Sequence, residues 1–211
     1  MLTDSLKFLR KVKNSFVRHT PSVEVLISRE NLLHNLRTYR RSYPDLSFAP
    51  VIKSNAYGHG IVQVAAILDV ENVPFLVVDS LYEAMILRNE GINTDILVIG
   101  YASARNICDC DLHGVAFAVT SVGQLFEIVK MVSRPLNIHL KIDTGMGRVG
   151  FYPDQAAADA VAVAGMRGIE IEGLMSHFSE ADLSDRSYAM RQLDIFSRVR
   201  KEISERFKRR G

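Results

Sequence analysis

The sequence FLVVDSLYEAMILRNEGINTDILVIG, residues 75–100, contains one full unit of the pattern that decides the fold. Its two ends, 75–80 and 95–100, are apolar almost throughout, and a helical stretch at 81–89 lies between them, with Gly91 as its stop. Continuous apolar runs are typical of strands buried on both faces, and a helix between two such strands indicates a parallel βαβ unit. We therefore predict an α/β fold with a parallel sheet.

The same alternation extends along most of the chain. It gives six apolar strands, and a complete eight-stranded barrel has about 250 residues, whereas this chain has 211. The pattern predicts a TIM-type (β/α)8 barrel truncated to about six βα units, with a doubly wound open sheet as the structural alternative. The other predicted strands are 46–54, 114–120, 136–143 and 169–177, and the other predicted helices are 28–40, 61–68, 122–132, 154–164 and 187–210.

One domain with a short N-terminal extension is expected. Residues 1–21 form a basic, amphipathic N-terminal extension that ends at Pro21, and residues 22–211 form one incomplete barrel domain. A short strand is predicted at 23–28, outside the six. Basic residues gather at both ends of the chain, but the net charge is only +2, so we expect solvated helix ends and no nucleic-acid binding.

The composition indicates a soluble globular protein, with 47% hydrophobic and 24% charged residues. No apolar run approaches the roughly 20 residues of a membrane span, so no membrane association is expected. Cys108 and Cys110 are too close in sequence for an ordinary disulfide and supply only half of a zinc site. We expect reduced thiols, no metal and a cytoplasmic location.

Three segments place polar residues at the ends of predicted strands: VIKSNAYGHG (51–60), KIDTGMGRVGF (141–151) and GLMSHFSEAD (173–182). In a parallel α/β barrel the carboxyl ends of the strands surround one shared mouth, where the active site lies. The three segments are therefore expected to meet there.

Lys53 ends the predicted strand 46–54 and precedes a glycine-rich loop. An amine in a partly dry pocket is a nucleophile toward aldehydes, whereas a lysine that extends to solvent from a strand end has no chemical role. Position alone leaves both interpretations open. Tyr57 is equally ambiguous, since its phenol is suited to a phosphate group or to packing within a turn.

The second segment places Lys141, Asp143 and Arg148 on one strand and the loop after it. Glycines in that loop permit a sharp turn that returns Arg148 to the barrel mouth. Its guanidinium is suited to a phenolate or a carboxylate, and a surface salt bridge with Asp143 is the alternative. His177 ends the sixth strand and is either part of the site or a structural histidine.

Together the three segments resemble the motifs of the alanine racemases. VIKSNAYGHG is similar to the family's cofactor-lysine motif, in which a lysine and one small residue precede Asn-Ala-Tyr-Gly-His-Gly. KIDTGMGRVGF resembles the second motif almost letter for letter, and GLMSHFSEAD resembles the third. The order and spacing of the motifs also agree, and the resemblance covers residues 22–211.

The resemblance implies roles for five residues. Lys53 would form the Schiff base with pyridoxal 5′-phosphate and act as the catalytic acid–base, and Tyr57 would hydrogen-bond the phosphate. Arg148 would approach the phenolic oxygen of the cofactor ring and help to place the substrate carboxylate. Lys141 corresponds to the lysine that many members carry as a carbamate, and His177 to the hydrogen-bond network behind the ring.

The implied reaction is the interconversion of L-alanine and D-alanine in a homodimer, which supplies D-alanine for peptidoglycan. The implied fold is a (β/α)8 barrel followed by a β domain. Against that pattern the sequence stops before the last two barrel strands and the β domain, which would pair with 23–28 and carry the second base. We therefore expect a fragment that racemises alanine very poorly alone.

Other functions stay open beside this one. A non-catalytic pyridoxal-phosphate-binding barrel, active in cofactor homeostasis, has a similar length but a different lysine motif. A related decarboxylase or a racemase for another amino acid shares the chemistry. An interaction module that uses the basic ends would bind nucleic acid in a salt-dependent way.

Overall fold

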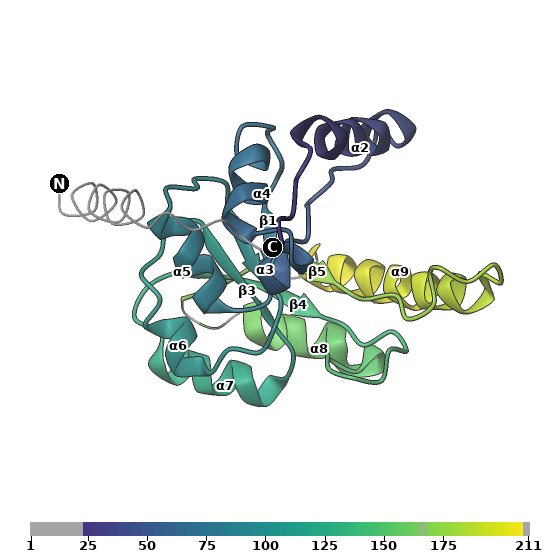
Figure 1. The fold of residues 1–211 in the computed structure, drawn as a ribbon. Coiled ribbons are helices and arrows are strands. Elements are labelled where there is room, and N and C mark those ends of the chain that lie inside the picture. The colour runs from purple at the N-terminus through teal and green to yellow at the C-terminus, as the bar shows by residue number, and fades with distance from the viewer. Residues whose placement is uncertain (1–22, 165, 167, 209–211) are drawn as a thin grey trace.

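A five-stranded parallel sheet forms the centre of the protein (Figure 1). The computed structural model describes residues 23–208 except 165 and 167. Strands neighbour one another in chain order, from β1 to β5, with every pair parallel. This order is that of a barrel wound in one direction and differs from a doubly wound sheet, whose order reverses. The strands are β1 (Leu76–Val78), β2 (Ile96–Val98), β3 (Val115–Val119), β4 (Leu136–Lys141) and β5 (Ile169–Met175).

Helices connect consecutive strands and cover the outer face of the sheet, as α5 to α8 show in Figure 1. Helix α2 precedes the predicted strand segment 46–54, and α9 follows β5. The helices are α2 (Arg29–Ser42), α3 (Lys53–Tyr57), α4 (Ile61–Leu68), α5 (Leu81–Asn89), α6 (Ala104–Cys108), α7 (Val122–Met131), α8 (Pro153–Ala164) and α9 (Ser187–Lys208).

Serine side chains define where four of the helices begin. The hydroxyl of Ser28 accepts a hydrogen bond from the Asn31 N–H, at the start of α2. Equivalent serines begin α5, α6 and α7. A serine in this position satisfies one of the N–H groups that the first turn of a helix leaves without a partner. The sequence predicted the cap at Ser28.

The side chains of the strands point alternately to two faces of the sheet. One set packs against the helices and forms the main core, which includes Ile96, Val98, Phe117, Ile138 and Leu140. The other set faces the inside of the barrel, where a smaller cluster is made by Val77, Leu97 and Ala116. Both faces are therefore apolar, which explains why these strands read as continuous hydrophobic runs.

Two predicted strands are wrong. Segment 46–54 forms no regular strand, because Val51 makes only an isolated parallel bridge to Val77 and Pro50 has no N–H to donate. Segment 23–28 forms no strand in the described chain, and its Val23, Val25 and Leu26 side chains are exposed. A strand needs a hydrogen-bonded neighbour, and local sequence does not reveal whether one exists.

The remaining differences are small. Helices α3 and α6 were not predicted, whereas the other six described helices begin and end within two residues of their predicted bounds. Cys108 and Cys110 are free thiols, as expected. The predicted extension 1–21 lies outside the described residues.

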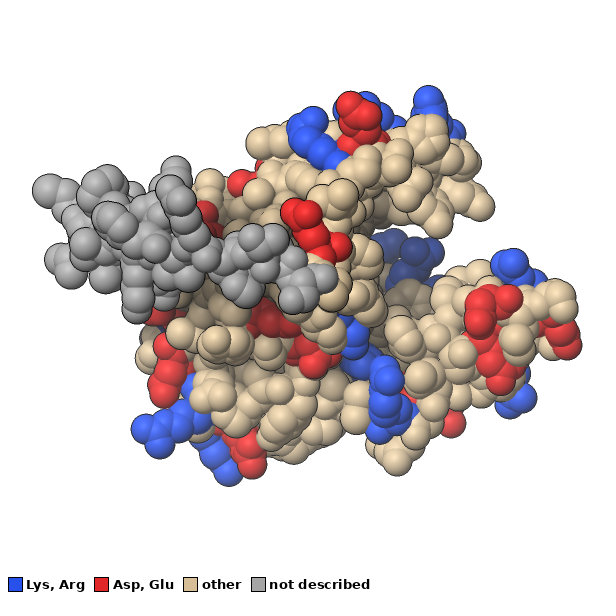
Figure 2. Space-filling view, viewed as in Figure 1, with Lys and Arg blue, Asp and Glu red and all other residues tan. Residues whose placement is uncertain are grey.

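Acidic and basic side chains are interspersed on the face shown in Figure 2. None of the described helices combines the length and the hydropathy that crossing a membrane requires.

The packing of α5 on the sheet gives a direct test of the core. Leu87 is fully buried, and Leu87→Ala removes apolar area and leaves a cavity. We expect the free energy of unfolding to fall by about 2–5 kcal/mol, measured by urea denaturation. Met85→Ala, on the exposed side of the same helix, is the control, and an equal loss in both variants would contradict the packing described here.

Candidate functional site

The first predicted site residue, Lys53, lies at the carboxyl edge of the sheet but at the start of α3 and not on a strand. Its Nζ lies 3.2 Å from Oδ1 of Asp79, which directly follows β1. The Lys53 side chain is 32% exposed and therefore only partly buried. The ion pair fixes the side chain without burying it.

Helix α3 has the opposite hand to an ordinary α-helix. Ser54, Asn55, Ala56 and Tyr57 have φ values of 54°, 55°, 52° and 53°. Each non-glycine residue in this region costs about 1–2 kcal/mol, and backbone strain of this kind occurs at functional sites. The turn therefore persists only because the surrounding contacts hold it.

Hydrogen bonds within the segment hold part of this turn. The side-chain oxygen of Asn55 accepts from the Ile61 N–H at 2.9 Å, at the start of α4. His59 Nδ1 lies 2.8 Å from the Ala56 carbonyl oxygen. Tyr57 is 62% exposed, and so it does not pack into the core. Its phenol is free to meet a ligand.

Lys141 is the last residue of β4 and is 7% exposed. Burial lowers the pKa of its amine, and the positive charges of Arg148 and Lys53 lower it further, against the opposing effect of Asp143 and Asp79. Arg148 and Lys53 are therefore close enough to Lys141 for their charges to act on its amine.

The loop after β4 folds around the carboxylate of Asp143. One oxygen accepts from the N–H groups of Gly145 and Gly147, each at 3.0 Å, and the other accepts from the Arg148 N–H at 3.1 Å. Burial raises the pKa of Asp143, but the backbone donors outweigh it and hold the pKa below its usual value. Asp143 thus positions the backbone of Arg148, and no side-chain ion pair between the two is found among the described residues.

His177 follows β5 at the same edge. Burial lowers the pKa of its imidazole first, and Arg148, Lys141 and Lys53 lower it further. The ring is therefore neutral at pH 7 and offers one donor and one acceptor. The same cations act on both Lys141 and His177, which places residues from all three sequence segments in one electrostatic neighbourhood.

Gln192, in α9, joins the loops after β4 and β5. Its amide nitrogen donates to the His177 carbonyl at 3.0 Å and to Thr144 Oγ1 at 3.4 Å. Its oxygen accepts from the N–H and the hydroxyl of Ser179, at 3.0 and 3.2 Å. The side chain is 1% exposed. It fixes the loops that carry Arg148 and His177, and a cavity of about 210 Å³ lies beside it.

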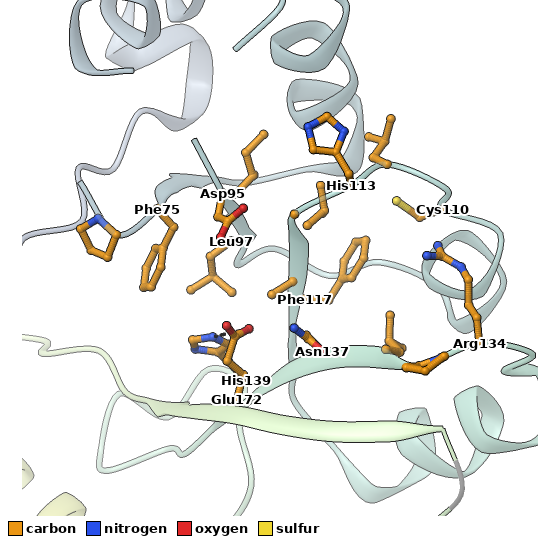
Figure 3. Close-up of a pocket in the computed structure, with 18 residues that line it drawn as sticks. Phe75, Asp95, Leu97, Cys110, His113, Phe117, Arg134, Asn137, His139 and Glu172 are labelled. Atoms are coloured by element: carbon orange, nitrogen blue, oxygen red, sulfur yellow. Dashed lines mark ion pairs between the residues drawn. The ribbon is translucent and has the colours of Figure 1, made fainter. Parts of the chain in front are cut away.

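A separate cavity of about 230 Å³ lies at the opposite, amino ends of the strands (Figure 3). His139 Nε2 lies 3.7 Å from Oε2 of Glu172 there, a contact that becomes an ion pair when the imidazole is protonated, and the ring of Phe75 meets that of His139 edge-on. Burial lowers the pKa of His139, and Glu172 partly offsets this. In parallel barrels this end contributes to stability and the carboxyl end carries the chemistry, so the candidate site is the carboxyl edge.

The structure therefore gathers Lys53, Lys141, Arg148 and His177, and places Tyr57 on the same turn as Lys53. Sequence reasoning missed Asp79 and Gln192. Asp79 follows an apolar strand, as the recognised polar segments do, and that position was an available signal. Gln192 lies within an amphipathic helix, and nothing local distinguishes it.

Comparison with known proteins now identifies what this arrangement resembles. The family model described as alanine racemase, N-terminal domain, matches residues 27–210. An alanine racemase of Caldanaerobacter subterraneus subsp. tengcongensis is 35% identical over 187 residues, which cover 86% of this chain and 48% of that protein. An alanine racemase of Desulforamulus reducens is 35% identical over 188 residues, covering 85% and 50%.

Solved structures give the same result. The alanine racemase of Clostridium difficile 630 in complex with cycloserine superposes with a TM-score of 0.78 at 30% identity, covering 83% of this chain and 50% of that one. The alanine racemase of E. faecalis has a TM-score of 0.78 at 28% identity, covering 83% and 49%. The chain spans about half the length of the relatives it matches.

The lowered pKa of Asp143 predicts a pH-dependent contribution to stability. The ionised carboxylate is favoured in the folded protein, so its contribution is present above the unfolded pKa of about 3.9. It is lost as the pH falls through the lower, folded value. We expect Asp143→Asn to be less stable than wild type at pH 7 and the difference to shrink below about pH 4, measured by urea denaturation. Asp45→Asn, at an exposed position, should show no such trend. If the difference in stability between wild type and Asp143→Asn grows in acid, the stabilising role of the Asp143 carboxylate is wrong.

The network of Gln192 predicts a second stability effect. Gln192→Leu keeps the volume of the side chain but removes the hydrogen bonds to the buried Thr144 hydroxyl and to the partly buried backbone groups of His177 and Ser179. We expect a loss of about 2–3 kcal/mol in the free energy of unfolding. Gln155→Leu, at an exposed position in α8, should change it by less than about 0.5 kcal/mol. Equal values for both variants would show that the network contributes nothing.

Proposed function

Because the chain belongs to the alanine racemase family through its N-terminal domain, we propose that it forms the cofactor-binding barrel of an enzyme that interconverts L-alanine and D-alanine. Residues 22–211 are the barrel domain in this proposal, and 1–21 are a basic extension. The observation that carries the proposal is the gathering of Lys53, Lys141, Arg148 and His177 at one edge of a parallel sheet.

The residues at this edge fit pyridoxal 5′-phosphate. The cofactor carries an aldehyde, an anionic phosphate and a phenolic oxygen, and the site offers an amine, an exposed phenol and several cations. Lys53 would hold the cofactor covalently, and Tyr57 would hydrogen-bond the phosphate. Arg148 would face the phenolic oxygen, and neutral His177 would donate or accept a hydrogen bond beside the ring.

The chemistry of the proposed reaction is a proton transfer at the α-carbon of the substrate. When bound, the cofactor withdraws electrons from that carbon and makes its proton acidic. The Lys53 amine, near its carboxylate neighbour Asp79, takes or returns the proton from one face. Arg148 binds the substrate carboxylate, with its backbone fixed by Asp143.

Lys141 is the proposed site of carbamylation. A buried amine with a lowered pKa has more of the neutral, nucleophilic form that reacts with carbon dioxide. The carbamate would be an anion beside Arg148 and would orient it. It would also remove one of the mutually repelling charges of the site.

The setting of the enzyme follows from this proposal. The opposite face of the substrate needs a second acid–base group, which we place in the partner subunit of a homodimer. D-alanine would serve cell-wall peptidoglycan, and the enzyme would act in the cytoplasm. Cycloserine, present in the Clostridium difficile structure, is expected to compete with alanine here as well.

Lys53→Ala tests the proposal in the intact protein. Wild type should show pyridoxal 5′-phosphate attached at Lys53 by mass spectrometry after borohydride reduction, together with D-alanine production from L-alanine. The variant should lose the attachment, and its activity should fall by a factor of about 10³ or more.

Lys130→Ala, which removes an exposed lysine of α7, is the matched control and should retain both properties. Attachment without any racemisation in the intact wild type would favour the non-catalytic cofactor-binding alternative. Attachment at another lysine would refute the role of Lys53.

A further inference from the structure

Glu83 is the third residue of α5 and lies at the same edge of the sheet as Lys53. It follows the cap Ser80 in the pattern Ser-x-x-Glu, which predicts a capping box. In a capping box the glutamate accepts a hydrogen bond from the N–H of the capping residue itself. The structure shows a different arrangement, because the carboxylate of Glu83 reaches the residue before the cap and a second segment of the chain.

The two carboxylate oxygens of Glu83 have different partners. Oε2 accepts from the Asp79 N–H at 2.8 Å, and Oε1 accepts from the Asn55 N–H at 3.3 Å. Asn55 and Asp79 are 24 positions apart in the sequence and lie in the segments after two neighbouring positions of the barrel. One carboxylate therefore links the two loops just beyond the Val51–Val77 bridge, where backbone hydrogen bonds join the preceding segments.

Both partners bear directly on Lys53. Asn55 lies in the left-handed turn that begins immediately after Lys53, and Asp79 supplies the carboxylate that pairs with its amine. The distance between the two loops sets the distance between the Lys53 backbone and its counterion. Beyond the backbone bridge at Val51 and Val77, Glu83 limits that distance through two backbone N–H groups, and the ion pair of 3.2 Å limits it through the side chains.

We propose that Glu83 is the positioning residue for Lys53: its carboxylate clamps the strained turn 54–57 against the Asp79 loop and so holds the Lys53 amine at its place in the site. Only the last step, the use of that amine toward pyridoxal 5′-phosphate, rests on the proposed function. The clamp itself consists of hydrogen bonds to two backbone amides and does not depend on that function.

Helix capping does not account for this arrangement. The Ser80 hydroxyl accepts from the Glu83 N–H at 3.3 Å and caps α5 without the help of the Glu83 carboxylate. The two functions are therefore separable. Ser80→Ala removes the cap and leaves the carboxylate, whereas Glu83→Gln leaves the cap and disturbs the clamp. The glutamine amide has one acceptor oxygen, so its NH₂ group must face one of the two N–H donors.

The experiment measures amide hydrogen exchange of Asn55 and Asp79 in the cofactor-free intact protein. Glu83→Gln should exchange at these two amides about tenfold faster than wild type, since a lost hydrogen bond frees them for local opening. In the same variant the rate at which Lys53 is labelled by pyridoxal 5′-phosphate, trapped with borohydride, should fall about fivefold or more.

Two controls separate positioning from general stability. Ser80→Ala should lower the melting temperature but leave Asn55 protected, and Glu90→Gln, at the exposed end of α5, should change neither readout. If Glu83→Gln does not fold, Glu83→Asp takes its place, since its shorter side chain reaches one of the two N–H groups and not both.

Unchanged exchange at Asn55 and Asp79 in the Glu83 variant would overturn the clamp, as would equal exchange in Ser80→Ala. Fast exchange with unaltered labelling of Lys53 would overturn its positioning role. If wild type is not labelled at Lys53, the proposed function fails, whereas the amide exchange still decides the clamp.

Discussion

The constraint on this site is the mutual repulsion of its basic side chains. The surrounding contacts must offset that repulsion to keep the side chains in place. At one edge of the sheet, burial and the charges of Arg148 and Lys53 lower the pKa of Lys141, and burial and all three cations lower the pKa of His177. Left alone, such groups would move apart into solvent. Asp79 holds Lys53 by an ion pair, burial in β4 holds Lys141, and Asp143 holds the backbone of Arg148. Positive charges held together in this way create a potential that favours an anionic ligand.

The loops of this edge are held by single side chains that each reach several partners. Asp143 gathers the loop after β4, and Gln192 ties that loop to the one after β5. Glu83 joins the two loops on the other side of the site. A side chain that accepts from several backbone groups at once restricts the geometry of the loop, because most alternative conformations would break two or more of its hydrogen bonds together. Such precision suits a reaction that depends on proton transfer.

The sequence predicted the fold class well because strands of a parallel sheet are apolar on both faces. Ile96, Phe117 and Leu140 meet the helices, while their neighbours meet the inside of the barrel. Prediction failed where a strand depends on a partner that local sequence does not show. Val51 is apolar and well placed, but it forms a single bridge.

The candidate site was predicted only in part. The motifs that can be recognised from the sequence alone contain Lys53, Tyr57, Lys141, Arg148 and His177. The roles of these residues stay predictions. The residues that hold them in place, such as Gln192 and Glu83, could not be predicted in this way. They connect loops that are distant in the sequence. The left-handed turn was equally hidden, because Ala56 and Tyr57 have no local preference for that conformation.

That turn has a stereochemical consequence. Ala56, with φ of 52° and ψ of 47°, has nearly the mirror image of ordinary right-handed helical geometry. A D-amino acid favours this conformation, so a D-alanine built into position 56 by chemical ligation would relieve the backbone strain there, although its methyl group would leave the buried position that the present one occupies. Glycine would also accept the geometry, but it would enlarge the conformational freedom of the unfolded chain. The segment next to the proposed cofactor lysine is thus one that enantiomeric building blocks would form more easily than the natural ones.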